Sequence, residues 1–183
     1  MNLVTPPAAD ETTDRIRSAA LSLFATRGYG NTTIEHISTE AGVGVATLYR
    51  RWDDKAAIAN DLYGMGLDSM VTILDEPEAD EPEAQFTEVW NRAWQWSTAN
   101  PKMFQFLNAS LGAPWLSEAN ATRKAQMSEV EVDMYARLRF DAPADFAAAL
   151  IGGALASVLA TEPDVEPDEV AARLWRALNL DAD

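Results

Sequence analysis

Two adjacent arginines, Arg50 and Arg51, follow a run of small and hydroxyl-bearing residues that includes Ala46 and Thr47. Arginine binds phosphate oxygens and the edges of bases, and hydroxyl groups bind phosphate. Small side chains at the start of a helix let its backbone approach DNA closely. The pattern therefore fits a helix that contacts DNA. It fits equally an ordinary three-helix packing unit with solvated arginines, and these residues alone do not separate the two interpretations.

Three short helices would have to position these side chains. The apolar residues of the first recur at helical spacing within 14–27 and are Ile16, Ala20, Leu23 and Phe24. A second helix is predicted to begin at Thr32, with Glu35 completing a capping-box pattern, and to end at Gly42. A third is predicted from Val45 to about Trp52. A helix, a short turn with glycine and a further short helix form a helix-turn-helix pattern.

The third predicted helix has one apolar side and one side of small, hydroxyl-bearing and basic residues. Leu48 and Trp52 share the apolar side, which predicts that they pack in the core. The remaining positions are Ala46, Thr47 and Arg50 opposite the core, Val45 and Tyr49 on one flank, and Arg51 on the other flank. The side opposite the core is the predicted DNA surface.

The formal net charge of −15 is distributed unevenly along the 183 residues. Residues 1–55 carry six basic and seven acidic residues, whereas residues 56–183 carry eight basic and 22 acidic residues. A uniformly acidic protein would repel nucleic acid. The uneven charge predicts two segments with different functions, which are residues 1–55, ordered from about residue 12 and the candidate DNA-binding domain, and residues 56–183. Most of the carboxylates can be explained by solubility alone.

The chain contains no cysteine and a single histidine, His36. Disulfides, thiolate metal sites, iron–sulfur ligation and a cysteine nucleophile are thereby excluded, as is any site that needs two histidines. No nucleophile–base or metal-ligand spacing stands out, so we expect no enzyme, no cofactor and no metal site. His36 is expected to be a surface or capping residue of the second helix.

Residues 75–84 form an acidic segment with six carboxylates, two prolines and no basic residue. This composition predicts a solvated loop. The ligand spacing and central glycine of an EF-hand are absent from it, so a calcium site is not expected. The chain shows no signal-peptide pattern at its start and no apolar run of about 20 residues, which predicts a cytoplasmic protein that does not enter a membrane.

The first quarter of the chain resembles the DNA-binding domain of the tetracycline-repressor (TetR/AcrR) family. The residues that carry the resemblance are Thr32–Ile37 (TTIEHI), Ala41–Trp52 (AGVGVATLYRRW) and Lys55, preceded by Leu23–Tyr29 (LFATRGY). The resemblance covers roughly residues 14–60. It implies an all-α chain of about nine helices, three of which bind DNA while the others form a ligand-binding and dimerisation body. It also implies a homodimer that binds a palindromic double-stranded operator, most often as a repressor, and that a small molecule releases.

The resemblance assigns DNA contacts position by position. Residues that would face bases or the groove are Val45, Ala46, Tyr49 and Arg50, and those that would hold phosphates are Thr33, Thr47, Arg51 and Lys55. Val45 stands where a polar or basic residue is frequent in the family, and Glu35 stands where some members carry a base-reading arginine. Glu35 is either the acid of the capping box or an acceptor for a cytosine amino group. The operator sequence therefore stays undefined.

The second predicted domain is rich in large apolar residues. Its predicted helices cover 54–73, 86–99, a segment opened by Pro101, 114–140, 143–161 and 167–180. Aromatic rings and methionines of the middle helices could line a pocket for an apolar or aromatic effector, with Trp90, Trp94, Phe104, Trp115, Met127 and Met134 as the predicted lining. Any one of these residues is more often core than pocket lining. Glu129 and Asp133 would favour a cation held against tryptophan faces.

The last two predicted helices combine small residues with leucines and a tryptophan. Small residues inside a helix cost stability unless another helix approaches closely, which an intramolecular contact or a dimer could explain. In the family that the sequence resembles, the last two helices pair with their symmetry mates. The predicted dimer residues are therefore Leu150, Gly153, Ser157, Leu174, Trp175 and Leu178.

Three functions were weighed on these grounds. The first is the ligand-responsive regulator that the resemblance implies. The second is a helical small-molecule-binding module that has lost specific DNA binding, which Val45 and Glu35 leave open. The third is a helical enzyme, which the missing catalytic residues disfavour.

Overall fold

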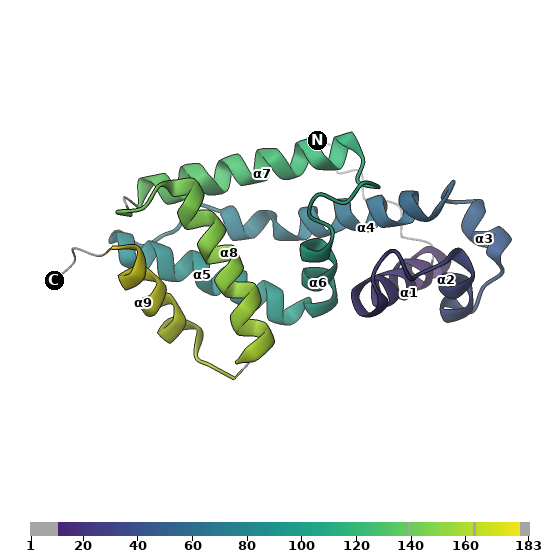
Figure 1. Ribbon diagram of the computed structural model, residues 1–183, viewed down its shortest axis with the longest axis horizontal. Helices are drawn as coiled ribbons and strands as arrows, with labels where there is room; N and C mark the ends of the chain where they lie inside the picture. The colour runs from purple at the N-terminus through teal and green to yellow at the C-terminus, as the bar shows by residue number, and fades with distance from the viewer. Residues whose placement is uncertain (1–10, 139, 163, 180–183) are drawn as a thin grey trace, which may run out of the picture. The chain divides into compact units, whose positions relative to one another are not determined.

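The computed structural model describes residues 11–138, 140–162 and 164–179. Within these residues the chain forms nine α-helices and one 3₁₀ turn and contains no strand, which confirms the predicted all-α class (Figure 1). The elements are α1 (Glu11–Arg27), α2 (Ile34–Ala41), α3 (Val45–Tyr49), α4 (Lys55–Met70), η1 (Val71–Leu74), α5 (Pro82–Ala99), α6 (Pro101–Ala109), α7 (Glu118–Arg137), α8 (Ala144–Thr161) and α9 (Pro167–Leu178).

The helices divide into two compact units. The first unit comprises Met1–Gly66 and Lys102–Ser117, and the second comprises Leu67–Pro101 and Glu118–Asp183. The first unit therefore holds α1, α2, α3, α4 up to Gly66 and nearly all of α6. It extends beyond the segment 1–55 that we predict to bind DNA.

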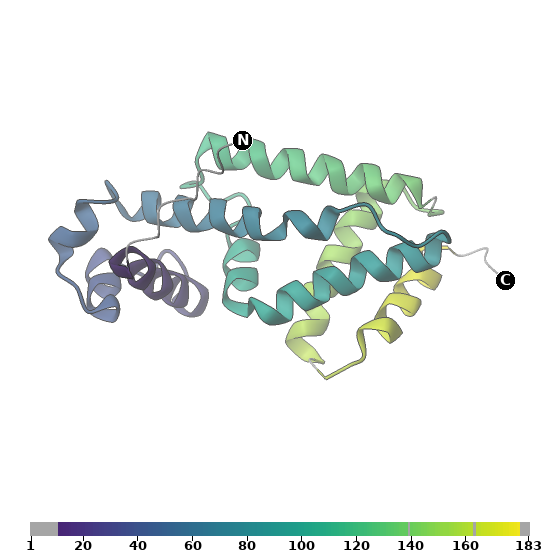
Figure 2. The ribbon, with the colours of Figure 1, turned by 180° about the vertical axis from the view of Figure 1, so that it is seen from behind.

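The core of the first unit is built from one apolar stripe of each helix. In α1 the stripe predicted from the sequence is buried, with Ile16 and Ala20 fully buried and Phe24 1% exposed. Ile37 of α2 and Ile58 of α4 pack in the same core. Figures 1 and 2 show α1, α2 and α3 lying against one another from opposite directions of view. A short helix such as α3 thereby gains its stability from packing, because five residues do not form a stable helix in isolation.

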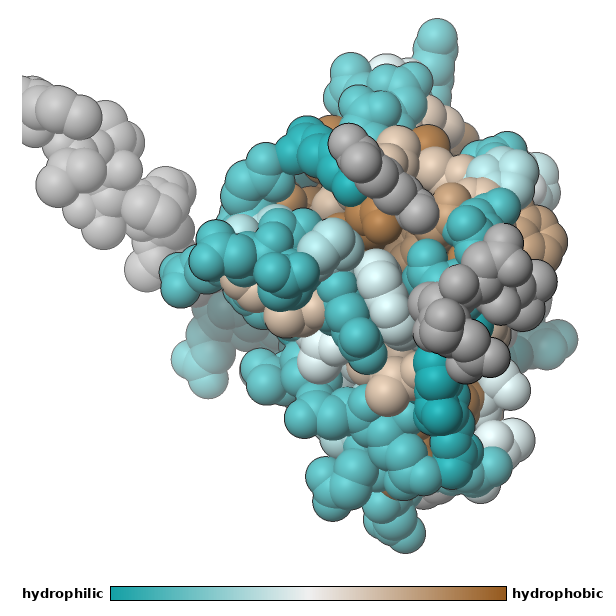
Figure 3. Space-filling view, turned by 90° about the vertical axis from the view of Figure 1, so that its left-hand side faces the viewer, coloured by the Kyte–Doolittle hydropathy of each residue, from teal (hydrophilic) through white to brown (hydrophobic). Residues whose placement is uncertain are grey.

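Two pairs of helices make the main contacts within the second unit. Helix α5 packs against α9, and α7 packs against α8 (Figure 2). An aromatic cluster closes one part of this unit, since the ring centroids of Phe140 and Trp175 lie 5.3 Å apart and those of Phe86 and Trp175 lie 5.9 Å apart. Seen from the side of α9, hydrophilic residues cover most of the surface, and apolar residues gather in its upper part (Figure 3).

The N-cap of the second helix lies one residue later than the sequence predicts. Thr33, not Thr32, is its N-cap, and its capping box is completed by His36, not Glu35. The backbone N–H of His36 donates to Thr33 Oγ1 (3.2 Å), and the backbone N–H of Thr33 donates to His36 Nδ1 (3.3 Å). Thr32 is fully buried and its hydroxyl donates to the carbonyl of Gly28 (2.9 Å). The capping role expected for His36 is confirmed.

Helices α5 and α7 also begin at other residues than the sequence predicts. Helix α7 begins at Glu118 and not at Pro114, because Asn60 holds the preceding segment out of the helix. Its amide group donates to the carbonyl of Trp115 and accepts from the backbone N–H of Ser117, both at 2.8 Å. Helix α5 begins at Pro82, inside the predicted loop 75–84, because the fixed φ of proline suits the first turn of a helix.

Candidate nucleic-acid interface

Helix α3 presents the residues predicted to contact DNA on its exposed side. Tyr49 is 54% exposed, and Ala46 and Arg50 are also exposed, whereas Leu48 is 1% exposed and packs in the core as predicted. The Arg50 side chain makes no hydrogen bond or ion pair with any residue that the structure describes. A guanidinium so placed, beside small and aromatic side chains, can enter a DNA groove.

The turn before α3 is held by an arginine that the sequence analysis did not single out. Gly42 ends α2 with φ of 64°, a left-handed conformation that glycine adopts without strain. The guanidinium of Arg15 donates to the carbonyls of Ala41 (2.6 Å) and Gly42 (3.1 Å). Arg15 therefore caps the carboxyl end of α2 from α1. No sequence signal could have found it, because the capping group lies 26 residues away.

Two of the predicted phosphate contacts also hold the first unit together. Lys55 Nζ donates to the carbonyls of Tyr29 and Thr32, both at 2.7 Å, and lies 4.0 Å from the centroid of the Tyr29 ring. Arg51 Nε donates to the hydroxyl of Thr13 (2.8 Å). The ammonium group has three N–H donors, so two of them are used inside the protein. The structure thus gives Lys55 and Arg51 partners that tie α3 and α4 to α1 and its turn.

The remaining predicted contacts lie near the ends of helices. Thr33 is exposed at the start of α2, and Val45 and Thr47 are half-buried in α3. Glu35 is exposed in the first turn of α2. Its pKa lies below the ordinary value, first because its own backbone N–H bonds the carboxylate and then because of the Thr33 hydroxyl. Glu35 therefore carries its negative charge without serving the capping box.

The six residues predicted to line an effector pocket divide between the two units. Trp90, Trp94 and Met134 are buried in the second unit, to which the half-buried Met127 also belongs. Phe104 and Trp115 belong to the first unit. Trp115 stacks on Tyr29 with ring centroids 4.8 Å apart.

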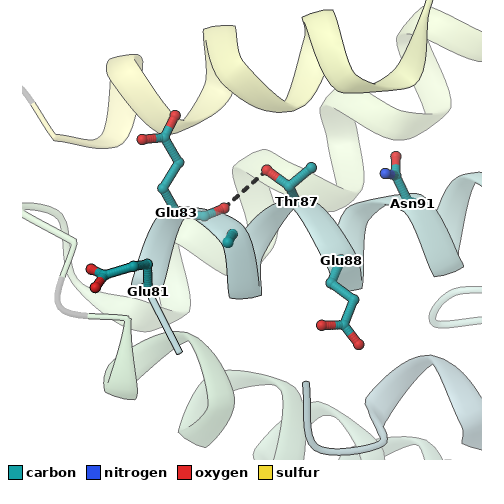
Figure 4. A pocket seen from close by; sticks show the side chains of 6 residues that line it. Glu81, Glu83, Thr87, Glu88 and Asn91 are labelled. Carbon is teal, nitrogen blue, oxygen red and sulfur yellow. Dashed lines mark hydrogen bonds between the residues drawn. The ribbon is translucent and has the colours of Figure 1, made fainter. Parts of the chain in front are cut away.

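A surface depression of about 590 Å³ lies along α5, away from these predicted residues. It is open to solvent and is lined by Glu81, Glu83, Ala84, Thr87, Glu88 and Asn91. Figure 4 shows Glu83 and Glu88 pointing to opposite sides of α5, so their carboxylates do not converge on one point. Within the described ranges, no group of three or more histidine, cysteine, aspartate or glutamate residues could hold a metal ion.

The predicted dimer residues differ in burial and fall into three classes. Leu150, Gly153 and Ser157 are exposed on α8, and Leu174 and Trp175 are half-buried on α9. Leu178 is 2% exposed and belongs to the core of the second unit. Helix α8 is also long and apolar enough to cross a membrane by length and composition, with a mean hydropathy of 1.6, and 17% of it is buried.

Comparisons with known proteins point to one family. Residues 16–62 match the family of bacterial regulatory proteins described as the tetR family. A comparison with curated proteins finds no match to this sequence.

Solved structures that resemble the chain include proteins with the same description. A TetR-family transcriptional regulator, PfmR, from Thermus thermophilus is 21% identical with a TM-score of 0.75 over 95% of this chain and 100% of that one. A regulatory protein of the tetR family from Rhodococcus RHA1 is 18% identical with a TM-score of 0.76 over 93% and 98%. The fatty acid degradation regulator FadR from Bacillus halodurans is 16% identical with a TM-score of 0.65 over 93% and 96%. Residues 16–62 therefore match the tetR family of bacterial regulatory proteins, and the chain as a whole has the fold of solved TetR-family regulators.

Proposed function

We propose that the protein is a ligand-responsive transcriptional repressor of the cytoplasm that binds a palindromic operator as a homodimer. The observation that carries the proposal is the exposed side of α3, where Ala46, Tyr49 and Arg50 stand on a helix whose other side is buried through Leu48. A helix held in this way can enter the major groove. The near-neutral charge of residues 1–55 permits this approach, whereas the acidic remainder would oppose it.

The surface of α8 supports the homodimer. Its exposed residues include a stripe of apolar and small side chains at helical spacing, which is Phe146, Ala149, Leu150, Gly153, Ser157 and Ala160. Phe146 is 58% exposed in a single chain. A Cβ atom added at Gly152 or Gly153 would meet nothing within 4 Å, so packing inside one chain does not require either glycine.

A second copy of the chain accounts for both features. Glycine inside an exposed helix costs about 1 kcal/mol relative to alanine, and close approach of a partner helix is a reason to keep it. Half-buried Leu174 and Trp175 on α9 would add apolar area, and buried Leu178 would support them from within. A two-fold operator also requires a two-fold protein.

The interior of the second unit supports an effector that is apolar or aromatic. The buried Nε1 of Trp96 on α5 finds no hydrogen-bond partner among the described residues. Burial raises the pKa of Glu131 on α7 above its ordinary value. The Trp96 N–H, on the same helix as Trp90 and Trp94, could orient a ligand whose remaining surface is apolar. The description of FadR as a fatty acid degradation regulator agrees with an apolar effector.

Selection of bound duplexes from a random pool tests the proposal. The expected result is a palindromic sequence with two half-sites about one helical turn apart or modestly more. Recovery of a sequence without two-fold symmetry would contradict the dimeric repressor. Recovery of no enriched sequence would favour the alternative, a small-molecule-binding module that has lost specific DNA binding.

A further inference from the structure

We propose that Asp61 is a positioning residue for DNA recognition, which it performs without contacting DNA. The inference rests on the proposed function and names a residue on α4 that sets the place of α3. Asp61 is not among the residues that the sequence predicts to bind DNA. The proposal concerns how the first unit holds its recognition helix.

One carboxylate joins three elements of the first unit. Arg17 of α1 donates to it twice, from Nε to Oδ2 (2.8 Å) and from Nη2 to Oδ1 (3.1 Å). The indole Nε1 of Trp52, in the segment that leads out of α3, donates to the same Oδ2 (3.1 Å). Asp61 itself lies within α4. The end of the recognition segment is therefore bonded to α4 and, through the same carboxylate, to α1.

Helix α3 has few contacts of its own, so the hydrogen bonds of the residues that follow it, Arg51 with Thr13 and Trp52 with Asp61, help to fix its place. It is five residues long, and Leu48 is its one buried residue. Gly44 precedes it and provides no side-chain hydrogen bond at the cap. A rotation of α3 about Leu48 would move Arg50 and Tyr49 out of place, and the Trp52–Asp61 hydrogen bond opposes that rotation from the carboxyl end of the helix.

The site is sheltered enough for the hydrogen bonds to matter. The side chains of Arg17 and Asp61 are 25% and 26% exposed. The pKa of Arg17 is raised above its ordinary value, chiefly by the hydrogen bond to Asp61. An asparagine at position 61 would keep the shape of the side chain. Its NH₂ group would face Arg17 Nη2 if it replaced Oδ1, or both Arg17 Nε and Trp52 Nε1 if it replaced Oδ2, so at least one N–H donor would lose its acceptor.

The charge of Asp61 makes the direction of the change in DNA affinity a test of its role. A negative charge in a DNA-binding unit repels phosphate, so neutralising it should strengthen binding if charge alone decides the outcome. The proposal predicts the opposite sign for Asp61→Asn. Asp68 on the same helix provides a matched control, because it is also paired with an arginine, Arg123, but lies in the second unit.

The first experiment measures duplex affinity of the full chain by fluorescence anisotropy, with the duplex obtained by selection. We expect Asp61→Asn to bind at least fivefold more weakly than the wild type, and Asp68→Asn to bind within twofold of it. Equal or tighter binding by Asp61→Asn overturns the proposal. Far-UV circular dichroism checks that both variants are folded. Should Asp61→Asn fail to fold, Trp52→Phe removes the indole donor alone and is expected to weaken binding about threefold.

A second experiment asks whether Trp52 and Asp61 act as one unit. The double variant is expected to bind no more weakly than Asp61→Asn, whereas multiplied losses would show independent effects and overturn the proposal. The indole N–H resonance of Trp52, assigned by its loss in Trp52→Phe, should shift in Asp61→Asn and stay in place in Asp68→Asn. An unmoved resonance also overturns it. This resonance is measured without DNA, so it tests the Trp52–Asp61 contact even if the wild type binds no duplex. Failure of the wild type to bind any duplex would contradict the proposed function.

Discussion

Replacing Lys55 by methionine tests whether this lysine acts inside the protein or on DNA. The change keeps a long apolar side chain and removes the ammonium group that bonds the carbonyls of Tyr29 and Thr32. We expect Lys55→Met to lower the free energy of unfolding, because both carbonyls belong to the turn between α1 and α2 and the lysine connects that turn to the start of α4.

The size of the effect follows from the contacts that are lost. Hydrogen bonds with a charged partner contribute about 1.5–3 kcal/mol each, and a cation over an aromatic ring adds about 0.5–1 kcal/mol at an exposed site. Lys55 is half-buried, so water can reach the carbonyls in the variant and recover part of this sum. We therefore expect a loss of about 2–3 kcal/mol, which corresponds to a fall in Tm of about 4–12 °C for a chain of this size.

The assay is urea unfolding followed by far-UV circular dichroism at one fixed protein concentration. Lys102→Met is the matched control, since among the described residues the ammonium of Lys102 donates only to the hydroxyl of Ser22 (3.0 Å), in an exposed hydrogen bond. This change should cost less than about 0.5 kcal/mol. Equal stability of the two variants would refute the structural role of Lys55. Unchanged stability together with a salt dependence of DNA binding that is flatter by about one unit would assign Lys55 to a phosphate contact.

Three further predictions concern the second unit. Gly153→Leu should weaken the dimer by separating the two copies of α8, whereas Ala125→Leu, at an exposed position of α7, should leave the dimer intact. Sedimentation equilibrium measures both. A Gly153→Leu protein that dimerises normally would place the interface elsewhere. Glu131→Gln should stabilise the protein near neutral pH, because burial raises the pKa of Glu131 in the folded state. The folded state then binds more protons than the unfolded state. The stability of the wild type therefore falls as the pH rises from the ordinary glutamate pKa through the raised value. Unfolding curves over this pH range should be flatter for the variant, and identical curves would contradict the prediction. An apolar or aromatic effector should quench tryptophan emission and release DNA with a coupling of about 1–3 kcal/mol, whereas quenching without loss of DNA affinity would indicate a passive pocket.

Local signals in the sequence predicted the helices of the first unit well. Apolar spacing marks α1, and Gly42 marks the end of α2, since its left-handed conformation favours glycine. The start of α2 was misplaced by one residue because Thr32 and Thr33 are both good N-cap residues. Burial of Thr32, and its bond to the carbonyl of Gly28, decide between them. That choice depends on packing against α1 and is invisible in a local pattern.

Contacts between distant residues could not be predicted in this way. Arg17 and Asp61 are 44 residues apart, and nothing in either neighbourhood indicates the other. Trp115 was predicted to line an effector pocket because it is a tryptophan in an apolar region. In the structure it stacks on Tyr29 and Phe106 in the first unit, with ring centroids 4.8 and 6.0 Å away. Whether an aromatic residue packs in the core, lines a pocket or joins neighbouring helices depends on the tertiary structure.

The surface of α8 shows what composition can and cannot indicate. The run of small residues around Gly153 predicts close helix approach, and the open space around both glycines agrees with a partner outside the chain. The sequence did not separate Leu150, which is 39% exposed, from Leu178, which is 2% exposed. Both are leucines on apolar helices, and only the packing of α9 against α5 distinguishes them.

The most direct test of DNA recognition by α3 is a salt titration of duplex binding with the wild type and Arg50→Ala. Arg50 is exposed, so its truncation should leave the stability of the protein unchanged. For the wild type, the logarithm of the binding constant should fall linearly with the logarithm of salt concentration, as phosphate contacts require. Arg50→Ala should bind the selected duplex more weakly by about 1–3 kcal/mol and relax the preference at one base position if Arg50 reads a base. Unchanged affinity and unchanged sequence preference in Arg50→Ala would contradict the recognition surface assigned to α3.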